Sequence, residues 1–446
     1  MHTDSTARLR RVSLPSWTPI AFALALGAIQ GFAAPAPVTV SGDWDLKVEG
    51  TILKVTPPAP VDITAEKHDV VPIYNPKAGG WARGLKLKTL VAQETTTPFL
   101  LDPSTVVVRA GADASSDKFE LGKDYQLEPS WGTLGRLEGG RIGEKQPIYI
   151  SYRYTPLRLD AVVKTASGKI EVRQGKPVGA SPAILPVAKD EERLANLWLP
   201  GPVAKLSPDH IFTSTETSYP EAAKPSPTMA EKRIPKAMAK LKSGEPLRIL
   251  AWGDSVTEAT YLPDYTKNRW QVQFVERLQK RFPTAKIELV TEAWGGRNTS
   301  SYLNEPPGSI HNYKEKVLGA KPDLVISEFI NDAGLKPEQV EERYGKLLAD
   351  FQSIGAEWII LTPHYSRPDW MGLKRERDID EDPRPYVTGL RVFAEKHSIA
   401  LADASLRWGR LWRQGIPYTI LLSNSINHPD PRGQKIFGDA LMEIFP

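Results

Sequence analysis

The hydrophobic positions in the first half of the chain follow a period of two. Runs such as VTVSGDWDLKV (38–48), STVVVRAG (104–111) and QPIYISYRY (146–154) alternate apolar and polar residues, with glycine, proline and aspartate between them. Such alternation, in runs rich in valine, isoleucine, threonine and tyrosine, is typical of strands with one buried face. We therefore predict a β-rich, sandwich-like domain at residues 37–200, with a hairpin turn at Ser167-Gly168.

The pattern changes from residue 229 onward, where short apolar runs alternate with amphipathic stretches such as 269–282 and 337–355. The apolar runs are predicted strands, at residues 247–252, 286–291, 323–329, 357–362 and 399–403. Strands that are apolar throughout and alternate with helices indicate a parallel sheet with helices on both faces. Residues 229–446 are thus predicted to form a three-layer α/β domain. The proline-rich segment 201–228 is the predicted linker between the two domains.

The first residues have the order of a secretory signal. Arg8, Arg10 and Arg11 precede the apolar run WTPIAFALALGAI, and small residues around Ala34-Pro35-Ala36 follow it. The apolar run is too short to span a bilayer comfortably. We predict a signal peptide at residues 1–36 and a secreted or periplasmic protein without a stable membrane anchor. An uncleaved anchor or a helix on the lipid surface is the alternative.

Polar clusters follow four of the predicted elements in the second half. Gly253-Asp254-Ser255 comes after the first strand, Gly295-Gly296-Arg297-Asn298 after the second, Asn331-Asp332 after the third, and Asn427-His428-Pro429 after the fifth. Functional crevices of open parallel sheets lie beyond the carboxyl ends of the strands. These four clusters are therefore expected to meet at one edge of the sheet.

Serine and histidine at such an edge indicate nucleophilic catalysis. A serine hydroxyl becomes a good nucleophile when a neighbouring base takes its proton, and histidine is the usual base at neutral pH. Ser255 and His428 are the predicted pair. The negative oxygen formed by attack on an ester needs donors, which the N–H groups of Ser255 and Gly296 and the side-chain amide of Asn331 can supply.

These residues resemble the SGNH hydrolases, also called the GDSL family, whose four blocks carry Ser, Gly, Asn and His in this order. GDSVT matches the block of the nucleophile Ser255, GGRNTS that of Gly296, IND that of Asn331, and NHP that of the base His428. The resemblance covers roughly the last two hundred residues. It implies a flavodoxin-like fold, a serine esterase activity with an acyl-serine intermediate, and no cofactor.

Two positions depart from the family pattern. Ile330 stands two residues before Asp332, where the family usually has glycine. The acid expected three residues before the histidine is replaced by Ser425. An acid there would hold the imidazole tautomer and stabilise the imidazolium. Ser425, Asn424, Asn427 or a main-chain carbonyl can orient His428 instead, and Asp430 is the nearest carboxylate in the sequence. The sequence leaves these alternatives open.

The other candidates near the site have less specific patterns. Asp254 and Asp332 are interpreted as supports, because a carboxylate beside a turn usually accepts backbone N–H groups. His364 follows the fourth strand and is the second-choice base and a possible substrate contact. The remaining candidate substrate contacts are Trp294, Arg297 and Trp370.

Composition narrows the function. Lys and Arg number 57 against 53 Asp and Glu, without a long basic run, which disfavours a nucleic acid partner. The chain has no cysteine, which excludes disulfides and thiolate catalysis. The dispersed histidines predict no metal site.

The sequence thus predicts an exported esterase that removes acetyl or another small acyl group from a polysaccharide or oligosaccharide. A lipid or aryl esterase is the alternative within the enzyme class. A catalytically weakened carbohydrate-binding envelope protein, suggested by Ser425, is the alternative outside it.

Overall fold

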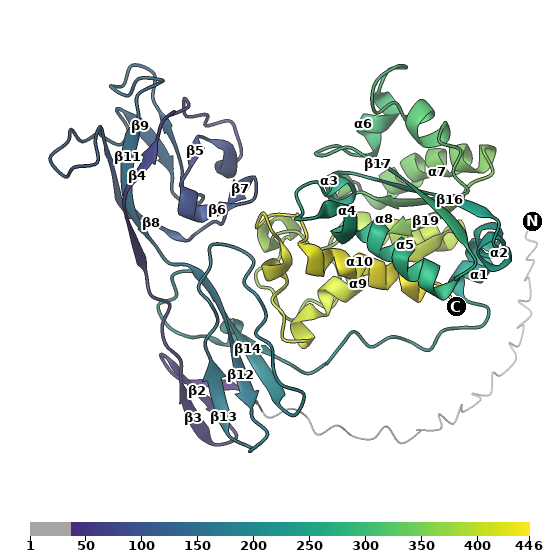
Figure 1. Cartoon of the computed structure of the whole chain (residues 1–446), viewed down its shortest axis with the longest axis horizontal. Coiled ribbons are helices and arrows are strands. Elements are labelled where there is room, and N and C mark those ends of the chain that lie inside the picture. The colour runs from purple at the N-terminus through teal and green to yellow at the C-terminus, as the bar shows by residue number, and fades with distance from the viewer. Residues whose placement is uncertain (1–36) are drawn as a thin grey trace, which may run out of the picture. The chain divides into compact units, whose positions relative to one another are not determined.

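The computed structural model describes residues 37–446 (Figure 1). The predicted signal peptide at 1–36 lies outside the described residues. Within the described part, no helix has both the length and the apolar character needed to cross a membrane.

The second half of the chain contains a five-stranded sheet in which every pairing is parallel. Its strands are β16 (Pro246–Gly253), β17 (Lys286–Ala293), β18 (Leu324–Glu328), β19 (Glu357–Leu361) and β20 (Ala400–Ala402). Their order is β17-β16-β18-β19-β20. This is the flavodoxin-like order 2-1-3-4-5, in which the strand order reverses at the first strand, so the functional crevice is expected beyond the carboxyl end of β16.

Helices cover both faces of this sheet, as the sequence pattern predicts. Side chains of β16 alternate between two cores: Ile249 and Ala251 belong to the core that includes α5 and α10, whereas Leu250 and Trp252 belong to the core that includes α7 and α8. The helices are α1 (Met229–Arg233), α2 (Pro235–Ser243), α3 (Ser255–Glu258), α4 (Tyr265–Asn268), α5 (Trp270–Arg281), α6 (Thr299–Asn304), α7 (Pro337–Ser353), α8 (Pro385–Lys396), α9 (Ala404–Gly409) and α10 (Pro431–Glu443). The predicted three-layer α/β fold is confirmed.

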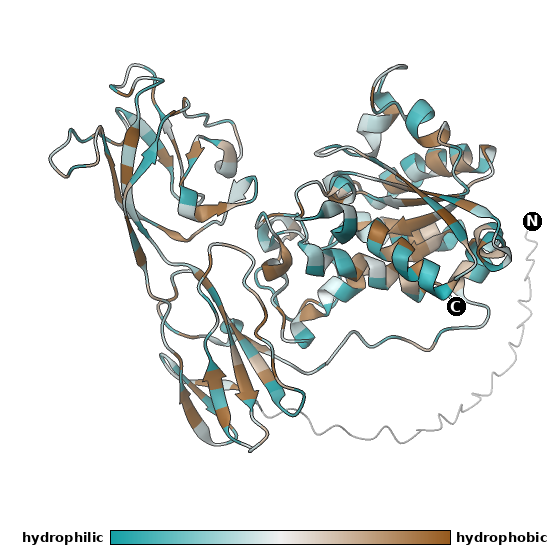
Figure 2. Cartoon of the chain, viewed as in Figure 1, coloured by the Kyte–Doolittle hydropathy of each residue, from teal (hydrophilic) through white to brown (hydrophobic). Residues whose placement is uncertain are grey.

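Helix α7 illustrates how the sequence specifies this packing. Pro337 occupies the first turn, where its missing N–H leaves no helical hydrogen bond unmade. Val340, Tyr344, Leu347 and Phe351 recur at helical spacing and are buried against the sheet. Figure 2 shows the same division, with hydrophobic residues concentrated on the central strands and hydrophilic residues on the outer sides of the helices.

The first half of the chain consists of antiparallel sheets, in agreement with the predicted β-rich region. One group has a common core and comprises β1 (Thr39–Gly42), β2 (Asp45–Val48), β3 (Thr51–Lys54), β12 (Leu157–Lys164), β13 (Ile170–Arg173), β14 (Glu192–Pro200) and β15 (Ile211–Thr213). The chain between β3 and β12 forms the remaining sheets, with β4 (Val61–His68), β5 (Leu85–Lys86), β6 (Val91–Ala92), β7 (Thr95–Thr96), β8 (Leu101–Arg109), β9 (Tyr125–Glu128), β10 (Thr133–Arg136) and β11 (Ile148–Tyr154). Two sets of sheets therefore occupy the region that the alternation pattern describes as one.

The structure agrees with the predicted hairpin turn but differs from the predicted linker. The turn at Ser167-Gly168 joins β12 and β13 as an antiparallel hairpin, as expected. The segment 201–228 is not wholly a linker, because its residues Ile211–Thr213 form β15 and pair with β14. These three residues can form a strand because they include no proline, and because the side chains of Ile211 and Phe212 are buried.

The antiparallel sheets and the α/β domain share a hydrophobic core. Trp198 and Phe212 from the sheets lie in the same buried cluster as Trp408, Leu411 and Tyr418 from the α/β domain. Polar contacts accompany this cluster: the side-chain amide of Asn196 donates to the carbonyl of Gly415 at 2.6 Å. Contacts from the first half of the chain therefore reach the loops of the second half.

Candidate active site

Ser255 lies where β16 ends and α3 begins, at the switch point of the sheet. Asp254 caps α3, since its carboxylate accepts the N–H of Val256 at 3.1 Å. Gly253 precedes it because a side chain does not fit: a Cβ there would lie 2.1 Å from the hydroxyl oxygen of Thr257. The tight turn leaves Ser255 partly exposed at the carboxyl edge of the sheet.

His428 approaches Ser255 from the loop between β20 and α10. Its Nε2 lies 3.1 Å from the hydroxyl oxygen of Ser255, which places the two side chains at hydrogen-bond distance. Asn424 shapes this loop, because its side-chain oxygen accepts the N–H groups of Ile426, Asn427 and His428 at 2.8–2.9 Å. The two residues that the sequence analysis paired are therefore in contact, although 172 residues separate them in the chain.

The other imidazole nitrogen of His428 faces a hairpin from the first half of the chain. Nδ1 lies 2.9 Å from the side-chain oxygen of Gln93 and 3.2 Å from a carboxylate oxygen of Glu94. An amide oxygen only accepts, so Nδ1 carries the proton and Nε2 is the nitrogen that accepts from Ser255. The β6–β7 hairpin (residues 91–96) thus determines the tautomer of His428.

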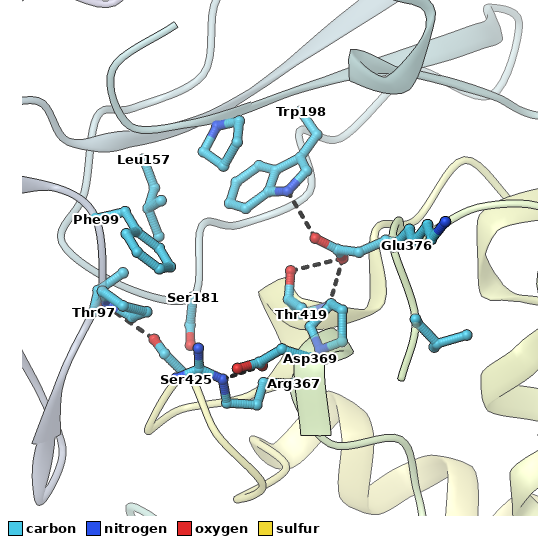
Figure 3. Close-up of a pocket in the computed structure, with 15 residues that line it drawn as sticks. Thr97, Phe99, Leu157, Ser181, Trp198, Arg367, Asp369, Glu376, Thr419 and Ser425 are labelled. Atoms are coloured by element: carbon cyan, nitrogen blue, oxygen red, sulfur yellow. Dashed lines mark hydrogen bonds and ion pairs between the residues drawn. The ribbon is translucent and has the colours of Figure 1, made fainter. Parts of the chain in front are cut away.

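The side chains that the sequence offered as partners of His428 are directed elsewhere. The hydroxyl of Ser425 lies 3.1 Å from that of Thr97, and Figure 3 draws this contact as a dashed line. Asp430 caps α10 and pairs with Arg432. Of the alternatives that the sequence left open, these two therefore have other partners, Thr97 and Arg432. Asn424 acts on the backbone of the loop and not on the ring.

Gly296 and Asn331 line the same pocket as Ser255 and His428, and its cavity volume is about 460 Å³. Gly296 has a φ of 71°, in the left-handed region that favours glycine. The side-chain amide of Asn331 donates to the carbonyl of Arg297 at 3.1 Å, which uses one of its two N–H groups. Its backbone N–H donates to Asp254 at 2.9 Å, so the turn of Ser255 and the loop of Asn331 are directly joined.

Asp254 and Asp332 are both buried. Burial raises the pKa of Asp332, although Thr299, Arg343 and Tyr344 donate to its carboxylate or lie paired with it. Asp332 therefore joins the loops that follow β17 and β18.

Asp254 has a buried acidic neighbour, Glu328, at the end of β18. Burial raises the pKa of both carboxyl groups; the charge of Asp332 adds to the effect on Asp254, and the charge of Asp254 adds to the effect on Glu328. Asp254 accepts two backbone N–H groups, whereas Oε1 of Glu328 has no hydrogen-bond partner among residues 37–446. Hydrogen bonds stabilise the ionised form, so the proton of this pair resides on Glu328.

The four predicted substrate contacts are placed differently from one another. Trp370 is 50% exposed and lines the pocket of Ser255. Trp294 stacks on His311, with ring centroids 4.6 Å apart. The guanidinium of Arg297 lies over the ring of Trp294, 5.2 Å from its centroid. Neither Trp294 nor Arg297 belongs to the described lining of that pocket.

His364 is fully buried, which corrects its assignment as an alternative base or substrate contact. Burial lowers its pKa well below the usual range, so the ring is neutral. Its Nε2–H donates to the carbonyl of Asn427 at 2.8 Å. His364 therefore supports the loop that carries His428 and does not reach the substrate pocket.

A second cavity of about 360 Å³ lies beside Trp198, Phe99 and Leu157 (Figure 3). Its lining includes Ser425 but neither Ser255 nor His428. Among residues 37–446, no group of three or more His, Cys, Asp or Glu side chains has an arrangement suited to a metal ion.

Several pocket residues were missed by the sequence analysis, namely Trp81, Gln93, Glu94 and Tyr261. The first three come from the β-rich region, where no motif marks them. The missing acid at position 425 was the one signal that a partner of His428 had to come from elsewhere.

Residues 251–436 match the GDSL-like lipase/acylhydrolase family. No curated protein sequence matches the chain. Three solved structures share a similar region at low identity. The first is a two-domain esterase active on acetylated mannans, with 17% identity, a TM-score of 0.38, and coverage of 48% of this chain and 52% of that one.

The second is a mutant of Axe2, an acetyl-xylooligosaccharide esterase from Geobacillus Stearmophilus, with 18% identity, a TM-score of 0.36, and coverage of 44% of this chain and 93% of that one. The third is a member of the lipolytic protein G-D-S-L family from Veillonella parvula DSM 2008, with 18% identity, a TM-score of 0.34, and coverage of 45% and 98%. The match spans about half the length of the two-domain esterase. On the family match to residues 251–436, the C-terminal part of this chain is a GDSL-like lipase/acylhydrolase domain, that is, an SGNH hydrolase domain.

Proposed function

We propose that the protein is an exported serine esterase that removes acetyl or similarly short acyl groups from a carbohydrate. The observation that carries this proposal is the 3.1 Å contact between the hydroxyl of Ser255 and Nε2 of His428 at the carboxyl edge of the sheet. A hydroxyl next to an imidazole whose other nitrogen is already hydrogen-bonded is arranged for proton transfer.

In the first half of the reaction, Nε2 of His428 takes the proton of Ser255 while the serine oxygen bonds to the ester carbonyl carbon. The tetrahedral intermediate then breaks its bond to the sugar oxygen, which leaves with the proton from His428 as an alcohol. In the second half, water attacks the acyl-serine with the same base, and the carboxylic acid leaves Ser255.

The developing negative oxygen needs donors that are in place beforehand. The N–H groups of Ser255 and Gly296 and the remaining side-chain N–H of Asn331 are the proposed donors. The link from Asp254 to the N–H of Asn331 supports this assignment, because it holds the asparagine loop next to the nucleophile turn.

The pocket lining supports a polar substrate with a short acyl group. Two indole rings, Trp81 and Trp370, lie at the pocket with centroids 5.6 Å apart. Hydrogen-bonding side chains make up much of the rest: Gln93, Glu94, Thr95, Asn331, Asn424 and Asn427. Among its described lining residues, Ile426 is the single aliphatic side chain larger than alanine. Stacking faces with many donors and acceptors suit a sugar, whereas a long acyl chain needs an apolar channel.

The test is the release of acetate from a panel of acetylated polysaccharides, compared with a series of nitrophenyl esters of increasing acyl length. We expect acetate release and a steep loss of rate beyond short acyl groups. Ser255→Ala should abolish hydrolysis, and Ser353→Ala, at an exposed serine at the end of α7, is the matched control. A preference for long acyl chains would favour a lipid esterase. Glycan binding with a hydrolysis rate unaffected by Ser255→Ala would favour a binding protein.

A further inference from the structure

The acid that the last loop lacks has a counterpart in the β-rich region. Gln93 and Glu94 form the two-residue turn between β6 (Val91–Ala92) and β7 (Thr95–Thr96), which pair as an antiparallel hairpin. Gln93 has a φ of 56°, in the left-handed region that few residues other than glycine adopt. Such backbone conformations persist where the surroundings hold them and are concentrated at functional sites.

The hairpin is anchored directly to the loop that carries His428. The hydroxyl of Thr95 donates to the carbonyl of Asn424 at 2.5 Å, and the hydroxyl of Thr97 lies 3.1 Å from that of Ser425. These contacts reach two successive residues of the loop, Asn424 and Ser425. These hydrogen bonds hold the tip of the hairpin next to the imidazole of His428.

Asn424 connects the carboxylate of Glu94 to the histidine loop. Its side-chain oxygen accepts the backbone N–H of His428 at 2.9 Å, while its side-chain nitrogen donates to Oε1 of Glu94 at 2.8 Å. The same oxygen of Glu94 lies 3.2 Å from Nδ1 of His428. One asparagine therefore holds both members of the pair.

We propose that Glu94 is the acid that positions and electrostatically supports His428, so that a residue of the β-rich region completes a Ser255–His428–Glu94 triad. This inference rests on the esterase function proposed above. Glu94 acts through His428 and is a positioning residue. The imidazole carries a positive charge after it takes the serine proton, and a carboxylate 3.2 Å from Nδ1 stabilises that charge.

Gln93 has a different part in the same turn. Its neutral amide oxygen accepts from Nδ1 and fixes the tautomer without supplying charge. Burial acts to raise the pKa of Glu94, but the hydrogen bond and charge of His428 and the hydrogen bond from Asn424 outweigh it, so the pKa lies below its ordinary value. Glu94 is accordingly ionised at neutral pH.

The charged and titratable groups around the imidazole are few enough to make a pH profile interpretable. Glu94 faces it from the hairpin and Tyr261 from its flat side, and Glu258 of α3 lines the same pocket. The buried groups Asp254, Glu328 and His364 lie behind the loops that carry Ser255 and His428. Of these, Glu94 is the one whose carboxylate lies beside Nδ1.

The experiment compares Glu94→Gln with the swap variant Gln93→Glu/Glu94→Gln in the full chain. Glu94→Gln keeps the shape of the side chain but removes its charge. We expect kcat to fall on the order of 10²-fold with a nearly unchanged KM, less than the roughly 10⁴-fold loss seen when a sole acid is replaced, because Gln93 still holds the tautomer. The acid limb of kcat/KM against pH should move to lower pH, since loss of the carboxylate makes the imidazolium less stable.

The swap variant places a carboxylate at position 93, whose side-chain oxygen is already 2.9 Å from Nδ1. It should recover most of the lost kcat and restore the acid limb, which a purely structural role of Glu94 would not produce. Glu138→Gln, at an exposed turn of the same region, is the matched control and should match the native enzyme.

Two outcomes overturn the inference. If Glu94→Gln keeps kcat within about twofold and leaves the pH profile in place while Ser255→Ala abolishes hydrolysis, Glu94 has no role in catalysis and the esterase proposal stands. If Ser255→Ala leaves hydrolysis unchanged, both proposals fail. If Glu94→Gln is less thermally stable but its folded fraction keeps the native kcat, Glu94 likewise has no role in catalysis.

Discussion

Tyr261 stacks on the imidazole of His428, with ring centroids 4.2 Å apart and ring planes 7° from parallel. Its hydroxyl donates to the carbonyl of Pro429 at 3.1 Å and accepts from the side-chain amide of Gln434 at 3.0 Å. The ring therefore forms one wall against which the imidazole rests, while the hydroxyl is anchored on the loop and helix that follow it.

The stacking predicts different effects for two substitutions of Tyr261. Tyr261→Phe keeps the ring, so kcat should change little, and the free energy of unfolding should fall by about 1 kcal/mol for the lost hydrogen bonds. Tyr261→Ala removes the wall, and we expect a loss of about 3 kcal/mol of stability together with at least a tenfold lower kcat. Denaturant unfolding and steady-state kinetics check both, and equal kcat values for the two variants would contradict the positioning effect.

The proposed role of Asn331 predicts a kinetic change confined to the chemical step. Asn331→Ala removes one oxyanion donor, and such removals lower kcat by about 10² to 10³ with little change in KM. Asn331→Asp is a useful companion, because a carboxylate of similar shape cannot donate to an oxyanion and should be at least as slow. A rise in KM at constant kcat would instead identify Asn331 as a ground-state substrate contact.

Glu328 predicts a pH dependence of stability. The unfolded chain loses this proton near the ordinary glutamate pKa of 4.5, whereas burial raises the pKa of Glu328 well above that value in the folded protein. Between the two pKa values the folded state binds more protons, so the free energy of unfolding falls as pH rises, by at most about 1.4 kcal/mol per pH unit.

Glu328→Gln removes this titration, and its unfolding free energy should fall less than that of the native protein between pH 5 and pH 8. Denaturant unfolding at several pH values measures the two slopes. Glu288→Gln, at a glutamate 58% exposed on β17, is the control and should follow the native slope. Parallel curves for the native protein and Glu328→Gln would show that Glu328 is ionised in the folded state.

The position of Trp370 predicts that its removal affects the hydrolysis of an oligosaccharide more than that of a small ester. The ring is half exposed in the lining of the pocket and lies close to Trp81. Trp370→Ala should raise KM for an acetylated oligosaccharide several-fold and leave kcat/KM for nitrophenyl acetate nearly unchanged. Equal losses on both substrates would place Trp370 in the support of the site and not in sugar binding.

The α/β fold was predictable because its signal is local. The apolar runs that became β16–β20 and the helical spacing of Val340, Tyr344 and Leu347 are visible in short windows of sequence, and the parallel sheet follows from their alternation. The expected edge of the sheet follows as well, since carboxyl ends of parallel strands share one side. The division of the β-rich region into two sets of sheets could not be predicted. Alternation marks the strands, but it does not reveal that β12 to β15 pack with β1 to β3 across the intervening chain.

The sequence by itself determined the flavodoxin-like domain and indicated that Ser255 and His428 approach each other, because both lie on loops that the strand order carries to one edge. Only the tertiary structure decided that Nδ1 of His428 meets Gln93 and Glu94, that Ser425 turns to Thr97, and that His364 is buried. The physical reason is that the first two outcomes depend on the docking of a hairpin more than 300 residues away in the chain, and the third on the packing of His364 against Trp408 and Phe437. Such long-range contacts are set by the shape and hydrogen bonding of whole surfaces, which leave no periodic pattern or short motif in the sequence.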